Sequence, residues 1–253
     1  MFNQLQLPSR MTNNPPLGWS LLDALFPPFC CSCGVLGFEL CPDCTNKILI
    51  IDQKKTCPIC GDFSEKGRIC QECRDNRPFY DQLRSWGEYS GVLRDAIRKF
   101  KFNHCLGLIR YLSKPSAEFI QSWNIKIDHI VPVPLSNTRQ HSRGYNQSAL
   151  LANSISKILR IESKYHAISR VKETLSQVGL NPEERRGNVF DAFKADIDES
   201  RNKSILVLDD IATTGSTLNE CAKALKNAGA KEVFCFTVAK TPITKTLFED
   251  YGG

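Results

Sequence analysis

The chain has 253 residues, of which 42% are hydrophobic, 15 are glycine and 13 are proline. This length allows one large domain, or a large domain with a small one, and the composition excludes collagen-like and low-complexity chains. Residues 1–80 contain eight basic and eight acidic side chains, so the formal net charge of +6 belongs to residues 81–253. A mildly basic body is compatible with a phosphate-rich partner but does not identify one.

Two further exclusions concern membranes and export. The sequence has no run of 18 apolar residues, which a membrane-spanning helix requires. Its first 20 residues lack the apolar region of a secretory signal peptide. We therefore expect a soluble, cytoplasmic protein with no transmembrane segment.

Composition divides the chain into three predicted regions, which span residues 1–29, 30–77 and 78–253. The first is a polar lead followed by the largely apolar stretch Leu17–Phe26, and Pro27 and Pro28 end any helix there. Because this stretch has an acidic residue and no basic one, we expect a short amphipathic segment that packs on the next region and does not lie on a membrane surface.

Cysteine is concentrated in the second region. The chain has 12 cysteines, nine of them between residues 30 and 73, and eight of these nine form four C-x2-C pairs. A C-x2-C turn presents two thiolates to one metal ion, and two such turns complete the tetrahedral four-sulfur site that zinc prefers. The pattern predicts a double-knuckle module with two structural zinc sites, whose ligands are Cys30, Cys33, Cys41, Cys44, Cys57, Cys60, Cys70 and Cys73.

Alternatives remain open for these cysteines. Neighbouring C-x2-C pairs close the shortest loops, so we expect the first pair to join the second and the third to join the fourth, but an interleaved cross-brace fits the spacing too. One of the two sites can be empty, and Cys31 is close enough in sequence to replace Cys30. An iron–sulfur cluster ranks second to zinc, and neither a disulfide framework nor a redox pair is expected in this context.

From residue 79 onward, strand-like and helix-like patterns alternate. Helices are predicted at residues 91–100, 146–159 and 217–229, and strands at residues 128–134, 204–208 and 232–239. The almost wholly apolar strand at 204–208 is typical of a parallel sheet that is covered on both faces. Strand–helix–strand repetition predicts an α/β fold, with a mainly parallel sheet flanked by helices.

The most specific motif follows the strand at residues 204–208. Asp209 and Asp210 come directly after the apolar segment, where parallel sheets bind their ligands. The next residues lead into a helix N-terminus, whose amides, hydroxyls and dipole suit a phosphate. A capping box formed by Thr217 and Glu220 is the alternative, but it explains neither the paired acids nor the Thr-Thr-Gly run. The predicted phosphate loop consists of Ala212, Thr213, Thr214, Gly215, Ser216 and Thr217.

This strand, acid pair and loop resemble the motif that binds phosphoribosyl pyrophosphate (PRPP) in type I phosphoribosyltransferases. In that family the acids hold the ribose hydroxyls and the loop holds the 5′-phosphate. The resemblance therefore implies ribose contacts for Asp209 and Asp210, and phosphate contacts for the loop at residues 212–217. It also implies Mg²⁺, which enters such sites with the substrate phosphates and keeps several waters.

Two other segments are similar to further parts of the same family. Val131–Leu135 and the R-G-Y-N-Q run that follows it resemble the pyrophosphate-binding loop, whose charge suits nearby cations. The implied pyrophosphate contacts are Lys101, Arg139, Arg143 and Gly144. A later polar segment looks like the flexible loop that closes over the reacting centre, with Thr174, Gln177, Arg185 and Asn188 as its matching residues.

The combined pattern resembles the ComF family over about residues 21–240, because cysteine knuckles precede V-P-V-P, R-G-Y-N-Q, T-x-x-Q and D-D-x-x-T-T-G-S-T. The resemblance implies a type I phosphoribosyltransferase fold behind a small zinc module. It also implies a role in natural transformation, with single-stranded DNA and competence helicase-like and DNA-processing proteins as partners. The alternatives are an active phosphoribosyltransferase of nucleotide metabolism whose acceptor is unknown, and a zinc-module scaffold for a helicase-like partner.

The helix at residues 91–100 offers a candidate track for single-stranded DNA, since basic residues interleaved with aromatic rings suit unpaired bases. The simpler interpretation places Phe100 in the core and the charges in solvent, and we favour it for Phe100. Lys101 and Phe102 stay open to either interpretation. The track consists of Arg94, Arg98, Lys99, Phe100, Lys101 and Phe102.

Overall fold

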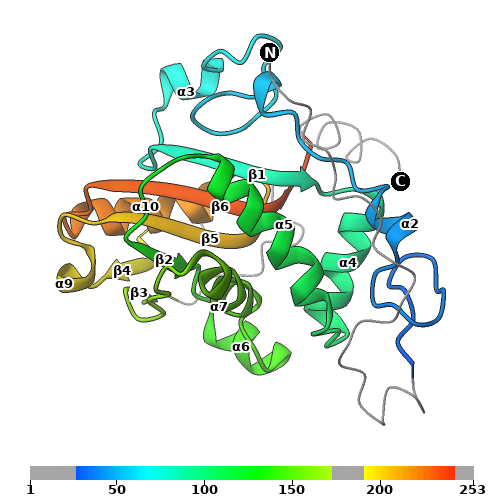
Figure 1. The fold of residues 1–253 in the computed structure, drawn as a ribbon. Helices are drawn as coiled ribbons and strands as arrows, with labels where there is room; N and C mark the ends of the chain where they lie inside the picture. Colours follow the sequence, from blue (N-terminus) through cyan, green and yellow to red (C-terminus); the bar gives the residue numbers. More distant parts are fainter. Residues whose placement is uncertain (1–26, 173–190, 243–253) are drawn as a thin grey trace, which may run out of the picture.

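The computed structural model describes residues 27–172 and 191–242, and a four-stranded sheet forms its centre (Figure 1). All four strands are parallel and lie in the order β1-β6-β5-β2. Their bounds are β1 (Gln82–Glu88), β2 (His129–Pro132), β5 (Ser204–Ala212) and β6 (Glu232–Lys240). The predicted α/β class with a mainly parallel sheet is confirmed.

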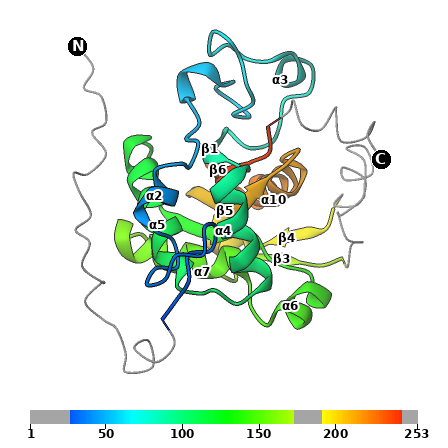
Figure 2. The ribbon, with the colours of Figure 1, turned by 90° about the vertical axis from the view of Figure 1, so that its right-hand side faces the viewer.

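Helices cover both faces of this sheet, and Figure 2 shows α5 and α10 on opposite sides of it. One face is covered by α4 (Gly91–Phe102), α5 (Leu108–Ser122) and α7 (Gln147–Leu159). The other face is covered by α10 (Ser216–Asn227) and by the antiparallel pair β3 (Ile168–Arg170) and β4 (Phe193–Ala195). Short helices in the connections are α2 (Pro42–Thr45), the 3₁₀ turn η1 (Gln53–Lys55), α3 (Gln71–Asp75), α6 (Asn137–Arg143) and α9 (Ile197–Ser200).

Successive side chains of β5 enter two separate cores, because neighbouring residues of a strand point to opposite faces. Leu206 and Leu208 pack with buried residues of α4, α5 and α7, and we call this group the first core. Ile205 and Val207 pack with buried residues of α10, and we call this group the second core. The segment Ile205–Leu208 of the strand is therefore wholly apolar, as a doubly covered parallel strand requires.

The two groups of cysteines lie in different cores. The first group contributes Cys30, Cys41 and Cys44 to the first core. The second group contributes Cys57, Cys60 and Cys73 to the second core. The cysteine-rich segment thus packs against both faces of the sheet.

The predicted elements of the α/β region are all present, and among the described residues six others were not predicted, namely β1, α5, α6, β3, β4 and α9. β1 and α5 had no clear periodic pattern, since the buried positions of β1 are Leu83, Ser85 and Gly87, of which only one is apolar and large, and α5 contains Pro115 in its interior. Cys41–Cys44, expected to be a tight turn, includes the single-turn helix α2 with Pro42 at its start. The amphipathic segment expected at Leu17–Phe26 lies outside the described residues. Within the described ranges, no helix is long and apolar enough to cross a membrane.

Candidate functional site

Each group of four cysteines forms one compact cluster. The four sulfur atoms of each cluster lie within 4.8 Å of one another, and Cys33 Sγ–Cys41 Sγ and Cys60 Sγ–Cys70 Sγ are both 3.6 Å apart. A tetrahedral zinc ion with bonds of about 2.3 Å places its sulfur ligands about 3.8 Å apart, so the spacing fits zinc. It is far longer than the ~2.0 Å bond of a disulfide. Pairing of neighbours is confirmed, the cross-brace is excluded, and Cys31 lies outside the first cluster.

Hydrogen bonds from backbone amides lower the pKa of one thiol in each cluster. Burial raises the pKa of a thiol, but backbone N–H groups donate to the sulfurs of Cys30 and Cys57 and lower the pKa to about 6 and about 7. Burial raises the pKa of Cys44 and of Cys73 to about 12. Four sulfur ligands with no open position are the donor set of a structural zinc site, and the structure supports two of them.

The two predicted carboxylates are consecutive residues near the carboxyl end of β5, which continues past the predicted end at Leu208 to Ala212, and they have different partners. Asp209 Oδ1 accepts a hydrogen bond of 2.6 Å from Ser148 Oγ and one of 2.9 Å from the Asp210 backbone N–H. Asp210 is only 5% exposed, and its Oδ2 forms an ion pair of 2.9 Å with Lys101 Nζ. Burial and the adjacent Asp210 charge raise the pKa of Asp209 to about 6. The pair therefore combines a buried Asp210, compensated by Lys101, with a half-buried Asp209.

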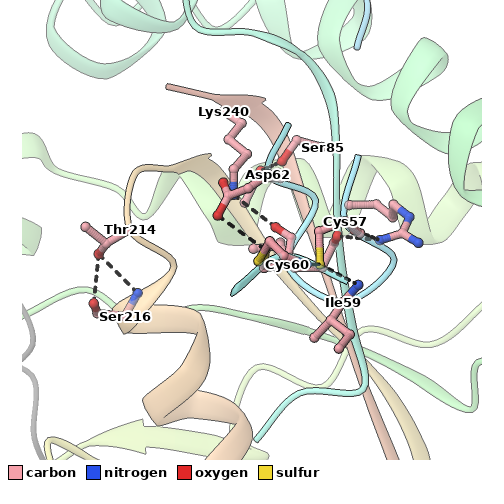
Figure 3. Close-up of polar contacts among 12 residues, drawn as sticks. Cys57, Ile59, Cys60, Asp62, Ser85, Thr214, Ser216 and Lys240 are labelled. Carbon is pink, nitrogen blue, oxygen red and sulfur yellow. Dashed lines mark hydrogen bonds and ion pairs between the residues drawn. The ribbon is translucent and has the colours of Figure 1, made fainter. Parts of the chain in front are cut away.

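The predicted phosphate loop connects β5 to α10. α10 begins at Ser216, and Gly215 precedes it with φ of 76°, a left-handed conformation that favours glycine. Thr214 Oγ1 lies 2.7 Å from Ser216 Oγ and accepts from the Ser216 backbone N–H at 3.3 Å (Figure 3). The capping-box alternative is wrong, because Gly215 takes the N-cap position and Glu220 accepts from the Asp191 backbone N–H at 3.0 Å.

The basic residues of the predicted pyrophosphate loop lie on α6 and at its end. Gly144 ends α6 in a left-handed conformation with φ of 75°. Arg143 Nη1 donates to Gln147 Oε1 at 3.1 Å. Burial and then Arg143 lower the pKa of Arg139, whereas Asp209 and Asp210 act in the opposite direction. Arg139 therefore lies within electrostatic reach of the acid pair.

The structure brings several predicted site residues together and adds two that the sequence did not single out. Lys101, from α4, meets the acid pair through Asp210 rather than pointing into solvent. Gln147, the last residue of the R-G-Y-N-Q run, and Ser148, which follows it at the start of α7, were not among the implied contacts. Gln147 is 1% exposed, and within the described ranges its Nε2 has no hydrogen-bond partner. The predicted flexible-loop residues lie outside the described residues, and they are Thr174, Gln177, Arg185 and Asn188.

The proposed DNA track resolves into a buried and an exposed part. Phe100 is fully buried, as the simpler interpretation predicts, and Arg94, Arg98 and Lys99 are exposed. Phe102 is 62% exposed, and the Arg143 guanidinium lies 4.9 Å from its ring centre. The ring of Phe102 and the cation of Arg143 thus lie next to each other, one residue along α4 from Lys101.

Comparisons with known proteins match both parts of the chain. Residues 113–251 match the phosphoribosyl transferase domain family, and residues 21–75 match the double zinc ribbon domain family. These two matches agree with the parallel sheet and with the two four-cysteine clusters.

Three curated relatives match most of the chain. Competence protein F of Haemophilus influenzae is 32% identical over 214 residues, which cover 79% of this chain and 90% of that protein. DNA utilization protein YhgH of Escherichia coli K12 is 29% identical, covering 74% and 85% respectively. Competence protein ComFC of Bacillus subtilis is 27% identical, covering 80% and 85%. The chain is therefore a member of the competence protein F family, with a double zinc ribbon ahead of a phosphoribosyl transferase domain.

Proposed function

We propose that this protein binds PRPP, or another phosphorylated ribose, and acts in DNA uptake on or near incoming single-stranded DNA in the cytoplasm. The observation that carries the proposal is the arrangement at the carboxyl end of β5. There Asp209 and Asp210 come one residue before the loop at residues 212–217, Lys101 of α4 forms an ion pair with Asp210, and Arg139 of α6 lies within electrostatic reach of both acids. The DNA part rests on the names of the relatives, which refer to competence and DNA utilization.

Each part of the proposed ligand has a matching group. Carboxylates accept hydrogen bonds from ribose hydroxyls, and backbone amides at the start of α10 suit a 5′-phosphate. Arg139, Arg143 and Lys101 supply the positive charge that a pyrophosphate needs, with Gly144 as the turn that leaves its backbone accessible. Asp209 and Asp210 would also hold Mg²⁺ together with the ligand, since this ion prefers carboxylates and phosphates and stabilises their charge.

Calorimetric titration of the zinc-loaded protein with PRPP and Mg²⁺ tests the proposal. We expect one binding site per chain, and loss of binding in the variant Asp209→Asn/Asp210→Asn. A matched control is Asp52→Asn/Asp75→Asn, which removes the same charge from two exposed acids. Absence of binding by the wild type, or equal binding by both double variants, would contradict the proposal.

The DNA part of the proposal is supported by the exposed ring of Phe102 and the half-buried Arg143 guanidinium next to it. Unpaired bases stack on aromatic rings, and cations pair with the phosphates between them. Binding of single-stranded DNA to this surface should weaken steeply as salt concentration rises, because counterions are released from the DNA. Binding that does not depend on salt would contradict a phosphate-driven interaction.

A further inference from the structure

The second zinc cluster lies next to the proposed phosphate loop. Cys57, Cys60 and Cys73 share the second core with Leu83, Ala212 and Leu218, whereas the first cluster shares its core with α4 and α5. A side chain at Gly215 would contact Leu83 Cδ2 and Tyr80 Oη at 3.5 Å each, so these two residues line the loop from behind. Both residues follow the second cluster closely in the chain.

Two chains of contacts join this cluster to the loop, and the first runs through the backbone. The Leu83 N–H donates to the Ile59 carbonyl at 2.6 Å, which attaches the cysteine turn at 57–60 to the start of β1. Gly61 fits tightly here, since a Cβ at this position would lie 2.8 Å from the Leu83 carbonyl oxygen. Any shift of the turn therefore moves the backbone that carries Leu83, and with it the contact to Gly215.

The second chain of contacts runs through Lys240, the last residue of β6. Lys240 is only 6% exposed, and its Nζ contacts Asp62 Oδ1 at 2.9 Å and the Cys60 carbonyl oxygen at 3.0 Å (Figure 3). The next residue, Thr241, donates its backbone N–H to the carbonyl of Ala212 at 3.0 Å. The knuckle of the second cluster is thus joined, through one buried lysine, to the first residue of the loop.

The negative charge of the occupied second cluster and of Asp62 explains why a lysine is buried beside them. A zinc ion with four thiolates carries a net charge of about −2, and Asp62 adds a further negative charge beside Cys60. A buried cation offsets this charge, and removing one partner of a buried ion pair leaves the other uncompensated. Lys240 therefore stabilises the occupied cluster and the end of β6 together.

We propose that the second zinc cluster controls the order of the phosphate loop, and that Lys240 is the positioning residue that couples the two. Loss of metal from this cluster releases Asp62, Cys60 and Leu83, and the loop at residues 212–217 then loses the contacts that line it from behind. The inference rests on the proposed function only in calling this loop a phosphate site. The first cluster has no comparable contact to the loop among the described residues, so its metal should have less influence.

The test compares the zinc-loaded variants Lys240→Met and Lys164→Met with the wild type. Lys164 is a matched control, because it also forms ion pairs, with Glu162 at 3.0 Å and Glu199 at 3.4 Å, but contacts neither cluster. Zinc release into a colorimetric chelator is measured first. Hydrogen exchange of the loop peptide at residues 212–217 is measured second and needs no ligand. PRPP affinity in the presence of Mg²⁺ is measured third.

In Lys240→Met we expect one of the two zinc ions to leave about tenfold faster, as loss of a charge-assisted contact predicts. Loop amides should exchange faster, while peptides of the first cluster should not change. Lys164→Met should behave as the wild type does. If Lys240→Met does not fold, Lys240→Gln removes the same positive charge while keeping a polar side chain and should give the same pattern.

Unchanged loop exchange would overturn the coupling, whether or not zinc leaves faster. A wild type that fails to bind PRPP would contradict the proposed function, but the exchange measurement would still decide whether the cluster controls the loop. Faster loop exchange with normal PRPP affinity would support the coupling and would count against the proposed phosphate role of the loop.

Discussion

Ser148 Oγ donates a hydrogen bond of 2.6 Å to Asp209 Oδ1, and this bond joins the first turn of α7 to the acid pair on β5. Asp209 also accepts from the Asp210 backbone N–H, so its carboxylate is held from two directions. A carboxylate with a fixed orientation binds a diol better than one that must be ordered first, since binding then costs less conformational entropy. Ser148 is therefore a positioning residue for the proposed ribose site.

Ser148→Ala should weaken PRPP binding about tenfold, which is the effect of losing one hydrogen bond to a charged group. Calorimetry with Mg²⁺ present measures it. Ser156→Ala is the matched control, because Ser156 lies on the same helix and donates to the Asn153 carbonyl at 3.0 Å. Equal affinities for the two variants would show that Ser148 does not position the carboxylate.

Lys101→Met should destabilise the ligand-free protein. The ion pair with Asp210 is largely buried, and its loss leaves an uncompensated carboxylate, which costs about 2–3 kcal/mol when discounted for partial exposure of the lysine. Urea unfolding measures the difference. The double variant Lys101→Met/Asp210→Asn removes both charges and should recover most of the stability. A double variant as unstable as Lys101→Met would indicate that the lysine acts through packing and not through charge.

The sequence could predict the parts of the site whose residues are close together in the chain, and it could not predict contacts between distant residues. The acid pair and the phosphate loop lie in one short stretch of sequence, so a local motif reveals their residues. The pairing of the cysteines follows from the preference for closing short loops. Ser148 and Asp209 are 61 residues apart, and Cys60 and Lys240 are 180 apart. Neither contact leaves a local pattern in the sequence. The first forms only when α7 packs on β5, and the second only when the end of β6 lies beside the cysteine turn at residues 57–60.

The same limit applies to the fold. β5 and β6 were predictable because strands that are covered on both faces contain a continuous run of mostly apolar residues. β1 lies at the edge of the sheet, and its half-buried Gln82, Arg84 and Glu88 hide the pattern of a strand. α5 contains Pro115, which is usually a signal against a helix interior, and its apolar face supplies the stability that the proline removes.

The raised pKa of Asp209 predicts a pH-dependent penalty on the fold. Its pKa is raised to about 6, above the value of about 3.9 in an unfolded chain, so the folded state binds the proton more tightly between these values. Stability contributed by this group is present at low pH and is lost as pH rises through about 6. Asp209→Asn removes the penalty and should stabilise the ligand-free protein by about 1 kcal/mol at pH 7.5.

Urea unfolding of the wild type and Asp209→Asn at pH 5.0 and pH 7.5 checks this sign. The advantage of the variant should grow with pH, and effects of pH on zinc binding cancel because both proteins have the same clusters. PRPP binding by the wild type should weaken below about pH 6, where the carboxylate becomes protonated. An advantage that is equal at both pH values would show that burial does not raise this pKa.

Zinc content should follow the cluster assignments residue by residue. We expect two zinc ions per wild-type chain, one in Cys33→Ser and two in Cys31→Ser, because Cys31 lies outside the first cluster. Native mass spectrometry counts the ions. Chelation of both should unfold residues 30–77 and destabilise the sheet, since structural metal binding is coupled to folding and the cysteines belong to both cores. Unchanged circular dichroism and protease resistance after chelation would refute a structural role.

Phe102→Ala should weaken binding of single-stranded DNA about tenfold, because each base that stacks on an aromatic ring contributes about 1–3 kcal/mol. Phe63→Ala is the matched control, since Phe63 is 66% exposed and Phe102 is 62% exposed, and Phe63 lies in the second zinc ribbon. Fluorescence anisotropy with a labelled oligonucleotide measures both affinities as salt is varied. Phe102→Ala removes no charge, so the slope of affinity against salt should equal that of the wild type. A larger loss in Phe63→Ala would move the DNA-binding surface from α4 to the zinc ribbon.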